Sequence, residues 1–322
     1  MTRIVTVDIG GTNARFALAE VEGGRVRSLG EPTTFQTVDH ASFRTAWEAF
    51  EAKSNETLPR AAAIAIAGPV KGDTIRFTNN PWTIRPATVG KDLDIDQVIL
   101  VNDFEAVGHA VAQADASDFV YLCGPADPLP EEGTITIVGP GTGLGVAHIW
   151  RGDGTYRVQA TEGGHIGFAP FDSIEDKILS RLRQKYRRVS VERVVSGPGI
   201  VEIYDALAAV EGRPVQLRDD KTIWQKGTNG EDSLAAAAVE RFCLMLGSAA
   251  GDIALAQGGS AVVIAGGLGQ RIKDSLIGSG FAERFRAKGR FEGLMAALPV
   301  KLITHPQPGL FGAAAAFAKA HA

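Results

Sequence analysis

Apolar and polar residues at the start of the chain fall into three short runs that Gly-rich turns separate. RIVTVD (3–8) is largely apolar, while ARFALAEV (14–21) and RVRSL (25–29) alternate between apolar and polar side chains. Runs of this kind, separated by glycines, are typical of strands joined as hairpins. The pattern therefore predicts that the chain opens with a three-stranded β-meander.

The same pattern returns near the middle of the chain, again with a Gly-rich turn after its first run, at TITIVG (134–139), LGVAHIW (144–150) and TYRVQA (155–160). Aligning Gly10 with Gly141 keeps the apolar phase, because Phe16 then falls over Ala147. Self-similarity at a fixed offset can indicate an internal duplication. A chance likeness between two hairpins gives the same spacing, so the pattern alone leaves both explanations open.

Helical and strand-like segments alternate through the rest of the chain. Phe43, Trp47 and Phe50 lie at helical spacing and predict a core-facing helix over 42–53. Further strands are expected at 61–68, 97–103 and 261–267, and further helices at 104–114, 173–188, 201–210, 233–257 and 308–320. This alternation predicts an α/β protein. Two halves that each begin with a meander imply two lobes and a cleft between them.

Composition and charge narrow the class of protein. The 322 residues are 45% hydrophobic, which allows two domains with separate cores. A formal net charge of −4 gives no support for a nucleic-acid partner, so a small ligand is expected. The longest apolar stretch, 234–259, contains Glu240, Arg241 and Asp252, which are costly in a bilayer. We therefore expect a buried helix there and no membrane association.

The cysteines and the N-terminal sequence indicate the compartment. Cys123 and Cys243 form no short CxxC spacing, so neither a zinc site nor a disulfide framework is expected. The opening MTRIVTVDIGG passes directly into a strand pattern, without the cationic segment and apolar stretch of a secretory signal. These features favour the cytoplasm.

The first candidate for chemistry is the turn after the first predicted strand, where Asp8 precedes Gly10, Gly11 and Thr12. Glycines let successive backbone amides approach phosphate oxygens, and Thr12 adds a hydroxyl donor. A carboxylate cannot bind phosphate itself, but it can hold a hydrated Mg²⁺ that bridges phosphates. The alternative is a Gly-Gly hairpin turn that the Asp caps.

A second Gly-rich turn, GPGTGLG (139–145), follows the equivalent strand of the second half. Two such turns can hold a polyphosphate from both lobes. No GK[ST] follows either turn, so neither is a Walker loop, and the segment after the second turn is strand-like, unlike a dinucleotide-binding motif.

Asn102 and Asp103 lie at a predicted strand-to-helix junction. Capping of the helix N-terminus is one explanation for polar residues at this place. The other is catalytic, because an Asp that faces the phosphate loops can accept the proton of a sugar hydroxyl as its oxygen attacks the γ-phosphorus.

Two further polar groups can bind a small ligand. Glu162 and His165 flank a Gly-Gly pair in TEGGHIGFAP (161–170) and can point at one polar ligand, although a lone His is often structural. Glu192 precedes an apolar pair and a Gly-Pro-Gly turn. An exposed ion pair with Arg193 or Arg188 is its alternative role.

Two more segments have simple structural explanations. The basic run RLRQKYRR (181–188) is expected to be a solvated helix face or a subunit contact rather than a nucleic-acid site. TNNPW (78–82) can contribute Asn79 to a cleft, or it can form an Asn-Pro turn with a packed Trp82.

Together these motifs resemble those of the bacterial ATP-dependent glucokinase family. The resemblance covers essentially the whole chain in the family's order, in DIGGTN (8–13), TNNPW (78–82), VNDFEAV (101–107), GPGTGLGVAH (139–148), EGGHIGFAP (162–170), SVERVVSGPGIVEIY (190–204), AGG (265–267) and PGLFG (308–312). It implies the two-lobed, duplicated actin-like ATPase (ribonuclease H-like) fold of sugar kinases with a central cleft. One lobe would comprise 1–113 and 304–322, with the last helix returning to it, and the other 114–303.

The resemblance also implies a role for each matching residue. Asp103 would be the base that takes the proton of the glucose 6-hydroxyl, and Asp8 would hold Mg²⁺ through water. Sugar-binding residues would be Asn102, Asp103, Glu162, His165, Glu192 and Asn79. ATP-binding residues would be Asp8, Ile9, Gly10, Gly11, Thr12, Asn13, Gly141, Thr142, Gly143, Gly266 and Gly267.

The resemblance implies partners and excludes others. ATP, Mg²⁺ and glucose are the expected ligands, and a homodimer is the expected assembly, with 173–189 at or near its interface. Residues 166–190 contain no Cys, so the structural zinc of related sugar kinases is not expected, and the chain starts at the first strand, which disfavours a DNA-binding repressor. A kinase for another hexose, a non-enzymatic sugar sensor and a chaperone-like ATPase are the alternatives.

Overall fold

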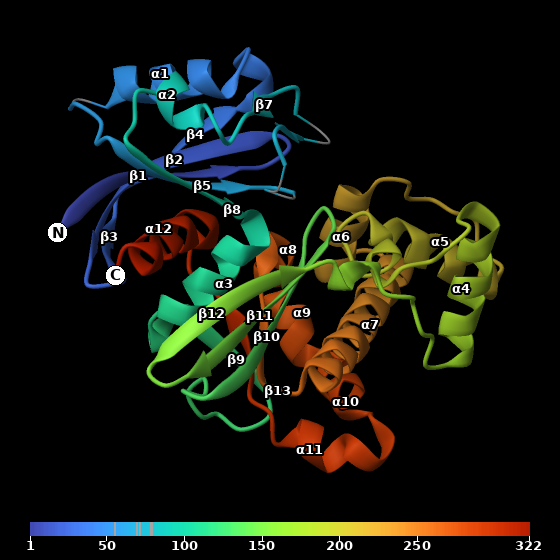
Figure 1. Cartoon of the computed structure of the whole chain (residues 1–322). Coiled ribbons are helices and arrows are strands. Elements are labelled where there is room, and N and C mark those ends of the chain that lie inside the picture. The colour runs from blue at the N-terminus through green and yellow to red at the C-terminus, as the bar shows by residue number, and fades with distance from the viewer. Residues whose placement is uncertain (55, 69, 71, 78–79) are drawn as a thin grey trace. The chain divides into compact units, whose positions relative to one another are not determined.

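Two sheets with the same strand order organise the chain, each inside its own compact unit. The computed structural model describes residues 1–54, 56–68, 70, 72–77 and 80–322. The first unit comprises Met1–Asp115 and His305–Ala322, and the second unit comprises Ala116–Thr304 (Figure 1). Each unit is an α/β arrangement of its own.

The sheet of the first unit has the order β3-β2-β1-β5-β8, and β4 pairs with the first residues of β2. Its strands are β1 (Thr2–Ile9), β2 (Asn13–Glu22), β3 (Arg25–Leu29), β4 (Thr33–Gln36), β5 (Ala61–Ile66) and β8 (Gln97–Asn102). The first three are antiparallel, and β5 and β8 add in parallel to β1. The predicted β-meander is confirmed.

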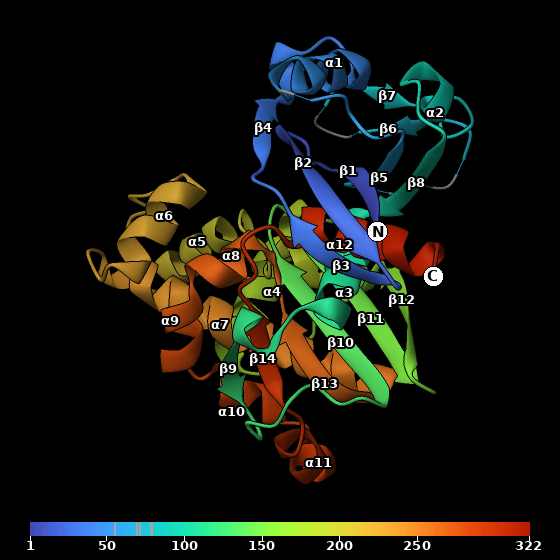
Figure 2. The same ribbon diagram turned by 90° about the vertical axis from the view of Figure 1, so that its left-hand side faces the viewer.

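Helices cover both faces of this sheet, so its central strands are buried on both sides. In β5, Ala62, Ile64 and Ile66 join one apolar cluster with the aromatic side chains of α1 (Phe43–Lys53). The alternate alanines join a second cluster with α12 (Pro308–Ala320), which packs beside α3 (Asp103–Gln113). Figures 1 and 2 both show α12, the last helix, beside β1, the first strand. Short elements complete the unit: β6 (Ile75–Arg76), β7 (Thr83–Ile84) and α2 (Val89–Asp92).

The sheet of the second unit has the order β12-β11-β10-β13-β14-β9. Its strands are β9 (Phe119–Cys123), β10 (Gly133–Pro140), β11 (Leu144–Gly152), β12 (Thr155–Thr161), β13 (Gly259–Ile264) and β14 (Val300–Ile303). Again an antiparallel meander leads into strands that add in parallel, because β13 and β14 follow β10. Five strands of each sheet therefore share one topology.

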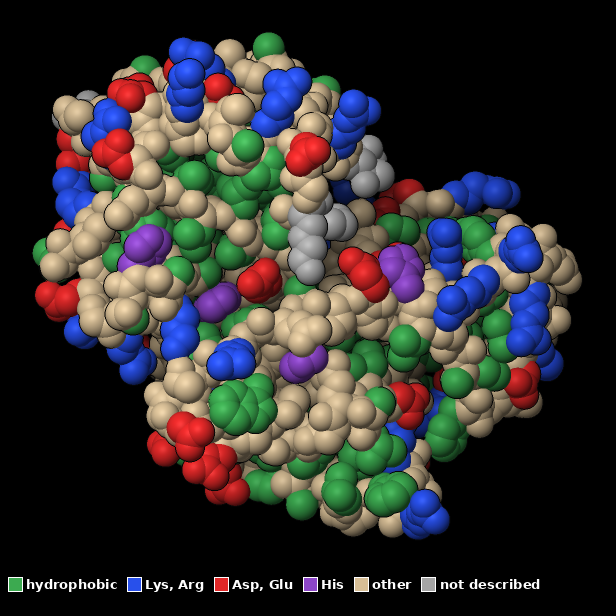
Figure 3. Space-filling model, in the orientation of Figure 1, with side chains coloured by type: hydrophobic (Ala, Val, Ile, Leu, Met, Phe, Trp, Pro, Cys, Tyr) green, Lys and Arg blue, Asp and Glu red, His purple; other side chains and the backbone are tan. Residues whose placement is uncertain are grey.

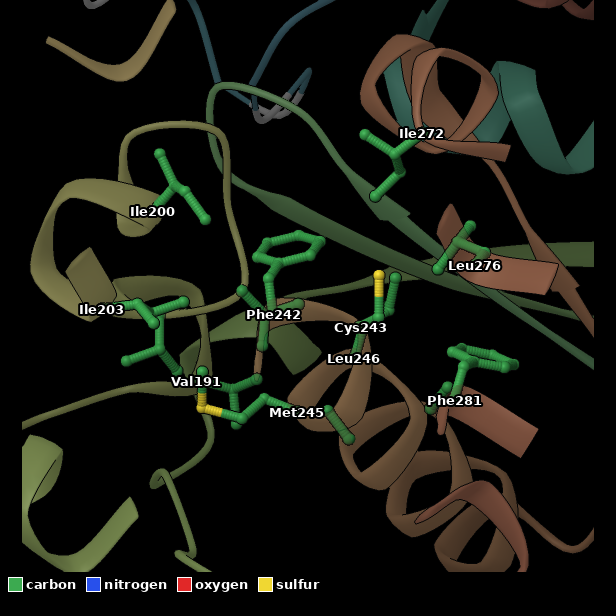
Figure 4. Packing of buried hydrophobic residues seen from close by; sticks show 14 of the residues in the cluster. Val191, Ile200, Ile203, Phe242, Cys243, Met245, Leu246, Ile272, Leu276 and Phe281 are labelled. Atoms are coloured by element: carbon green, nitrogen blue, oxygen red, sulfur yellow. The ribbon is translucent and has the colours of Figure 1, made fainter. Parts of the chain in front are cut away.

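The second unit surrounds a long core helix, α7 (Ser233–Gln257). Figure 4 shows Phe242, Cys243, Met245 and Leu246 of α7 packed between side chains of the flanking elements. By length and hydropathy α7 passes the test for a membrane span, but 67% of the tested window is buried inside the protein. The predicted buried helix is confirmed. The other helices are α4 (Ser173–Lys185), α5 (Gly199–Glu211), α6 (Asp220–Thr228), α8 (Gly266–Arg271), α9 (Lys273–Gly278), α10 (Phe281–Arg286) and α11 (Glu292–Ala296).

The two meanders match each other, but not in the alignment that the sequence suggested. In the first, Ile9 pairs with Ala14, and in the second, Pro140 pairs with Leu144. The second turn is therefore shorter by one residue. A single offset through both strands cannot represent this difference.

The register corrects the predicted equivalence of Phe16 with Ala147. When the strand pairs are matched, Phe16 corresponds to Val146, and both side chains are fully buried. In this alignment, residues 14–19 of β2 and residues 144–149 of β11 have the same order of buried and half-buried positions. The shared topology and burial support an internal duplication over a chance likeness.

The strand predicted at 261–267 ends earlier than expected. β13 stops at Ile264, and Gly266 has φ +83°, a left-handed conformation that turns the chain into α8. Gly266 and Gly267 therefore lie in the first turn of a helix rather than at the end of a strand.

Candidate functional site

The turn between β1 and β2 has its carbonyl groups fixed by the protein. The Gly10 amide donates to the Asn13 carbonyl at 2.9 Å, which closes the turn. The buried Thr37 donates from Oγ1 to the Gly11 carbonyl at 3.0 Å and from its backbone amide to the Thr12 carbonyl at 2.9 Å. Within the described part of the chain, the Gly11 and Thr12 amides have no acceptor of their own. These amides form the kind of donor pair that binds an anion.

Asp8 lies at the base of this turn, near the end of β1. Its side chain is 23% exposed, and Nη1 of Arg15, the facing residue on β2, is 3.4 Å from its Oδ2. Burial raises the pKa of Asp8 above its usual range, and the nearby Arg15 guanidinium opposes this shift. The carboxylate is thus desolvated and only weakly neutralised by the protein.

The first turn of α12 lies directly against Asp8. A Cβ added at Gly309 would be 2.6 Å from Asp8 Oδ2, which no ordinary side chain allows. Next to it, the buried Thr6 donates from Oγ1 to the Leu310 carbonyl at 2.7 Å. Because the N-terminal end of a helix is partly positive, this placement favours the charged form of Asp8.

The structure separates the roles of Asn102 and Asp103. Asn102 caps α3: its Oδ1 accepts from the amides of Phe104 at 2.9 Å and Glu105 at 3.1 Å. Its Nδ2 donates to the Gly68 carbonyl at 3.0 Å. Asp103 is the first residue of α3, and the cap does not depend on its carboxylate.

The Asp103 carboxyl group lies in a poorly solvated position. Burial raises its pKa to about 6, and the negative charge of Asp8 adds to this increase. A hydrogen bond from the Phe104 amide to Oδ1 at 3.0 Å acts in the opposite direction. A carboxylate with such a pKa is ionised at neutral pH yet more basic than an exposed Asp, as a general base requires.

In the second unit, the turn after β10 is held by its neighbours. The Gly141 amide donates to the Gly143 carbonyl at 2.8 Å, and the Gly197 amide donates to the Gly141 carbonyl at 2.7 Å. The Leu144 amide, at the end of the turn, donates to Glu192 Oε2 at 2.8 Å. Among the residues that the structure describes, none forms a hydrogen bond with the Thr142 side chain.

Glu192 belongs to a short 3₁₀ turn, Val191–Arg193, and is half-buried. Among the described residues it forms no ion pair with Arg188 or Arg193, and the Arg193 guanidinium instead stacks on the Tyr186 ring at 4.1 Å. The exposed ion pair considered from the sequence is therefore absent. Oε2 accepts from the Leu144 amide, and no hydrogen bond joins Glu192 Oε1 to another described residue.

Glu162 precedes another 3₁₀ turn, Gly163–His165, and His165 is the last residue of that turn. Their side chains are 80% and 60% exposed, and His165 Nε2 is 3.8 Å from Glu162 Oε2. The Val191 amide donates to the Ile166 carbonyl at 2.9 Å. This bond ties the Glu162–His165 segment to the turn that carries Glu192.

The basic run at the end of α4 is a solvated surface. Lys185 pairs with Glu202 at 2.6 Å and Arg181 with Asp205 at 3.7 Å, both on α5. The remaining cations, Arg183, Arg187 and Arg188, are exposed, and Figure 3 shows Lys and Arg side chains gathered over α4. The expectation of a solvated helix face is consistent with this arrangement.

The candidate residues thus form two sets, one in each unit. The first unit brings together the 10–13 turn, Asp8 and Asp103, and the second unit brings together the 141–143 turn, Glu162, His165 and Glu192. Asn79 lies outside the described residues.

A glucokinase family model matches residues 5–320. The chain belongs to the glucokinase family. It is 61% identical to the glucokinase of Zymomonas mobilis subsp. mobilis over 315 residues, which cover 98% of this chain and 97% of the relative.

Solved structures of the same kind share its fold. A glucokinase from an Antarctic psychrotroph superposes with a TM-score of 0.87 at 35% identity, covering 98% of both chains. A ROK-family glucokinase from Streptomyces griseus, solved in complex with glucose and AMPPNP, superposes with a TM-score of 0.62 at 19% identity, covering 97% of this chain and 98% of that chain. The chain therefore has the predicted actin-like ATPase fold of the sugar kinases.

Three residues around this glucokinase-family site were not singled out from the sequence. Thr37 holds the first turn, Arg15 faces Asp8, and Gly309 receives the Asp8 carboxylate. Arg15 lies two residues after Asn13 in the predicted strand that follows the turn. The alternation of apolar and polar residues in that strand could have indicated Arg15 as a polar neighbour of the turn. Thr37 and Gly309 approach the turn only through tertiary folding.

Proposed function

We propose that this protein transfers the γ-phosphoryl group of ATP to the 6-hydroxyl of D-glucose, with Asp103 as the general base. The observation that carries this proposal is that Asn102 and Asp103, at the start of α3, have different roles. Asn102 provides the helix cap through the Phe104 and Glu105 amides, so capping does not require the Asp103 carboxylate, which lies in the same unit as the 10–13 turn. Membership of the glucokinase family supports the substrate and the donor.

The chemistry needs one proton acceptor and no covalent intermediate on the enzyme. Asp103 accepts the proton of O6 as that oxygen forms a bond to the γ-phosphorus. The bond from phosphorus to the bridging oxygen breaks, and ADP leaves with that electron pair. Backbone amides of the turns stabilise the charge on the transferring group.

The sugar would be held by side chains that pair with several hydroxyls at once. We assign this role to Asn102, Asp103, Glu162, His165, Glu192 and Asn79. Each sugar hydroxyl both donates and accepts, so an epimer that leaves one protein group unpaired loses about 1–3 kcal/mol of binding.

The nucleotide would be held by backbone amides from both units. Its phosphates are assigned to Asp8, Ile9, Gly10, Gly11, Thr12, Asn13, Gly141, Thr142 and Gly143, and its adenosine to the Gly266 and Gly267 turn. The open amides of Gly11 and Thr12 support the first assignment.

Mg²⁺ fits the donor set around Asp8. Mg²⁺ is commonly held by one or two carboxylates together with substrate phosphates and water. In the described residues no group of three or more His, Cys, Asp or Glu side chains could hold a metal ion, whereas Asp8 offers a desolvated carboxylate beside the phosphate turn. Asp8 would hold the ion through water, and the ion would supply positive charge to the phosphates.

The two compact units would be the two lobes of the kinase, with domain boundaries near 113–116 and 303–305. Closure of the lobes on glucose would exclude water that otherwise attacks ATP. We also propose a cytoplasmic homodimer with 173–189 near its interface. Light scattering on the purified chain measures the assembly, and a monomer at assay concentration would contradict the dimer.

A hexose panel tests the function. ADP release with Mg-ATP is measured with glucose, mannose, fructose, N-acetylglucosamine and no sugar, for wild type and Asp103→Ala. Glucose-dependent release that the mutant lowers by about 10² or more supports the proposal. Preference for another hexose would mean that this hexose, not glucose, is the substrate. ADP release without any sugar would indicate an ATPase, and no ADP release with any sugar would indicate a sugar sensor. Chelation with EDTA should abolish activity, and added Mg²⁺ should restore it.

A further inference from the structure

The carboxylate of Glu192 reaches the turn after β10. Its Oε2 accepts from the Leu144 amide at 2.8 Å, immediately after the 141–143 turn. Glu192 and Leu144 lie 48 positions apart in sequence. A side chain assigned above to the sugar is therefore bonded to a segment assigned to the phosphates.

Gly143 is the residue that allows this approach. A Cβ at Gly143 would lie 2.5 Å from Glu192 Oε2 and 3.2 Å from its Cδ. Gly143 does not have a positive φ, so its backbone would accept other residues. Gly141, in the same turn, would meet nothing within 4 Å of an added Cβ. The need for glycine at 143 thus comes from Glu192.

The segment around Glu192 is bonded on both sides. The Gly197 amide donates to the Gly141 carbonyl at 2.7 Å, and the Val191 amide donates to the Ile166 carbonyl at 2.9 Å. The same segment therefore contacts the 141–143 turn and the loop that carries Glu162 and His165.

We propose that Glu192 couples sugar binding to nucleotide binding, and that Gly143 is the positioning residue that makes this possible. Oε2 fixes the Leu144 amide while Oε1 accepts a sugar hydroxyl, so a bound sugar stabilises the turn in its phosphate-binding form. This inference rests on the proposed function. Coupling of this kind is reciprocal: glucose and nucleotide each tighten the binding of the other by the same factor.

Calorimetry measures this factor with glucose and the non-hydrolysable analogue AMPPNP, each titrated with and without the other. For wild type we expect a coupling of about fivefold or more. Glu192→Ala should bring the coupling close to one. Glu192→Gln keeps an oxygen for the Leu144 amide, so its AMPPNP affinity should stay near wild type even where its glucose affinity falls.

Gly143→Ala tests the positioning role without removing a functional group. It should raise the Kd of glucose about tenfold or more, because its Cβ displaces the carboxylate. The control Gly293→Ala, whose added Cβ would meet nothing within 4 Å, should change the Kd of glucose by less than about twofold. In the Glu192→Ala background the carboxylate is absent, so adding Gly143→Ala should cause no further loss of glucose binding.

Two results would overturn the inference. One is additive loss in the double variant, and the other is unchanged coupling in Glu192→Ala. If circular dichroism shows that Gly143→Ala is unfolded, the coupling factors measured for Glu192→Ala and Glu192→Gln decide whether the inference holds. A wild type that binds and phosphorylates glucose without any coupling rejects this inference alone, whereas a wild type that binds no glucose rejects the proposed function first.

Discussion

The Asp8 carboxylate occupies the space that a side chain of residue 309 would need: a Cβ added at Gly309 would lie 2.6 Å from Asp8 Oδ2 and 2.7 Å from its Cγ. One residue belongs to the first strand and the other to the last helix. The position of α12 therefore sets the space in which the Asp8 carboxylate can lie.

Gly309→Ala is expected to displace Asp8 and impair catalysis. A displacement of a catalytic group by about 1 Å can cost about 10² in rate, so we expect kcat with Mg-ATP to fall 10- to 100-fold. The KM for glucose should change less, since Asp8 is assigned to the phosphate side. Steady-state kinetics with each substrate varied in turn measures the effect. Gly293→Ala is the control, because its added Cβ meets nothing within 4 Å. Equal kinetics for both variants would contradict the role of Gly309.

The raised pKa of Asp103 predicts the acid limb of the pH-rate profile. A general base acts in its ionised form, so kcat/KM for glucose should be constant well above pH 6 and fall about tenfold per pH unit below it. The limb should be absent from the residual activity of Asp103→Asn. A wild-type limb near pH 4, the range of an exposed Asp, would contradict the raised pKa of Asp103, and a limb that persists in Asp103→Asn would show that another group is the titrating base.

The same pKa predicts that Asp103 reduces stability at neutral pH. Its pKa rises from 3.8 in the unfolded chain to about 6 in the folded protein, so the folded state binds the proton more tightly. Stability then decreases as the pH rises from about 4 to about 6 and stays lower above that range. Asp103→Asn keeps the acceptor for the Phe104 amide without the charge. It should stabilise the protein by up to about 3 kcal/mol at pH 8, and chemical denaturation should show no difference at about pH 3, where the group is protonated in both the folded and the unfolded state. A less stable variant at pH 8 would contradict the argument.

A buried charge cluster in the second unit predicts a strong stability effect. Arg284 is 5% exposed and pairs with Glu175, which is 1% exposed, and with Asp172 at 3.2 Å. Arg284→Ala would leave Glu175 buried with only part of its compensation, and we expect a loss of about 3–5 kcal/mol in the free energy of unfolding.

Urea denaturation measures this loss, and Arg60→Ala is the matched control. Arg60 pairs with Asp94 at 2.9 Å and with Asp96 at 2.8 Å, but all three side chains are at least half exposed. Exposed pairs contribute little, so the control should leave the urea midpoint nearly unchanged. A similar midpoint for both variants would show that the buried cluster does not stabilise the unit.

The sequence predicted the elements whose signal is local. The meander of β1 to β3 follows from alternation and glycine turns, and the helix at Phe43, Trp47 and Phe50 follows from one apolar face. The four-residue β14 was not predicted, because a run that short has no periodicity of its own and exists only through pairing with β13. The end of β13 was predicted too late because apolar runs do not reveal the left-handed φ of Gly266.

The candidate site likewise contains residues that a local sequence pattern predicts and contacts that no local pattern predicts. Asp8 and the 10–13 turn, and the junction at Asn102, are local patterns and could be predicted as candidates. The sequence could not decide between capping and catalysis at the junction, because only the folded structure shows that the Asn102 side chain caps α3. Contacts across long sequence separations, such as Gly309 with Asp8 and Glu192 with Gly143, depend on packing and leave no local signal.

Because α12 packs against the first strand, the two units cannot be completed in the order in which their first residues are translated. Thr6 of β1 donates to the Leu310 carbonyl, 304 positions later, and the second unit lies wholly between the two parts of the first. During translation the second unit has its complete sequence before the first unit does. The surface of the first sheet that α12 covers stays uncovered until residues 308–320 have left the ribosome, so the Asp8 side of the site is completed only after the whole second unit has been synthesised.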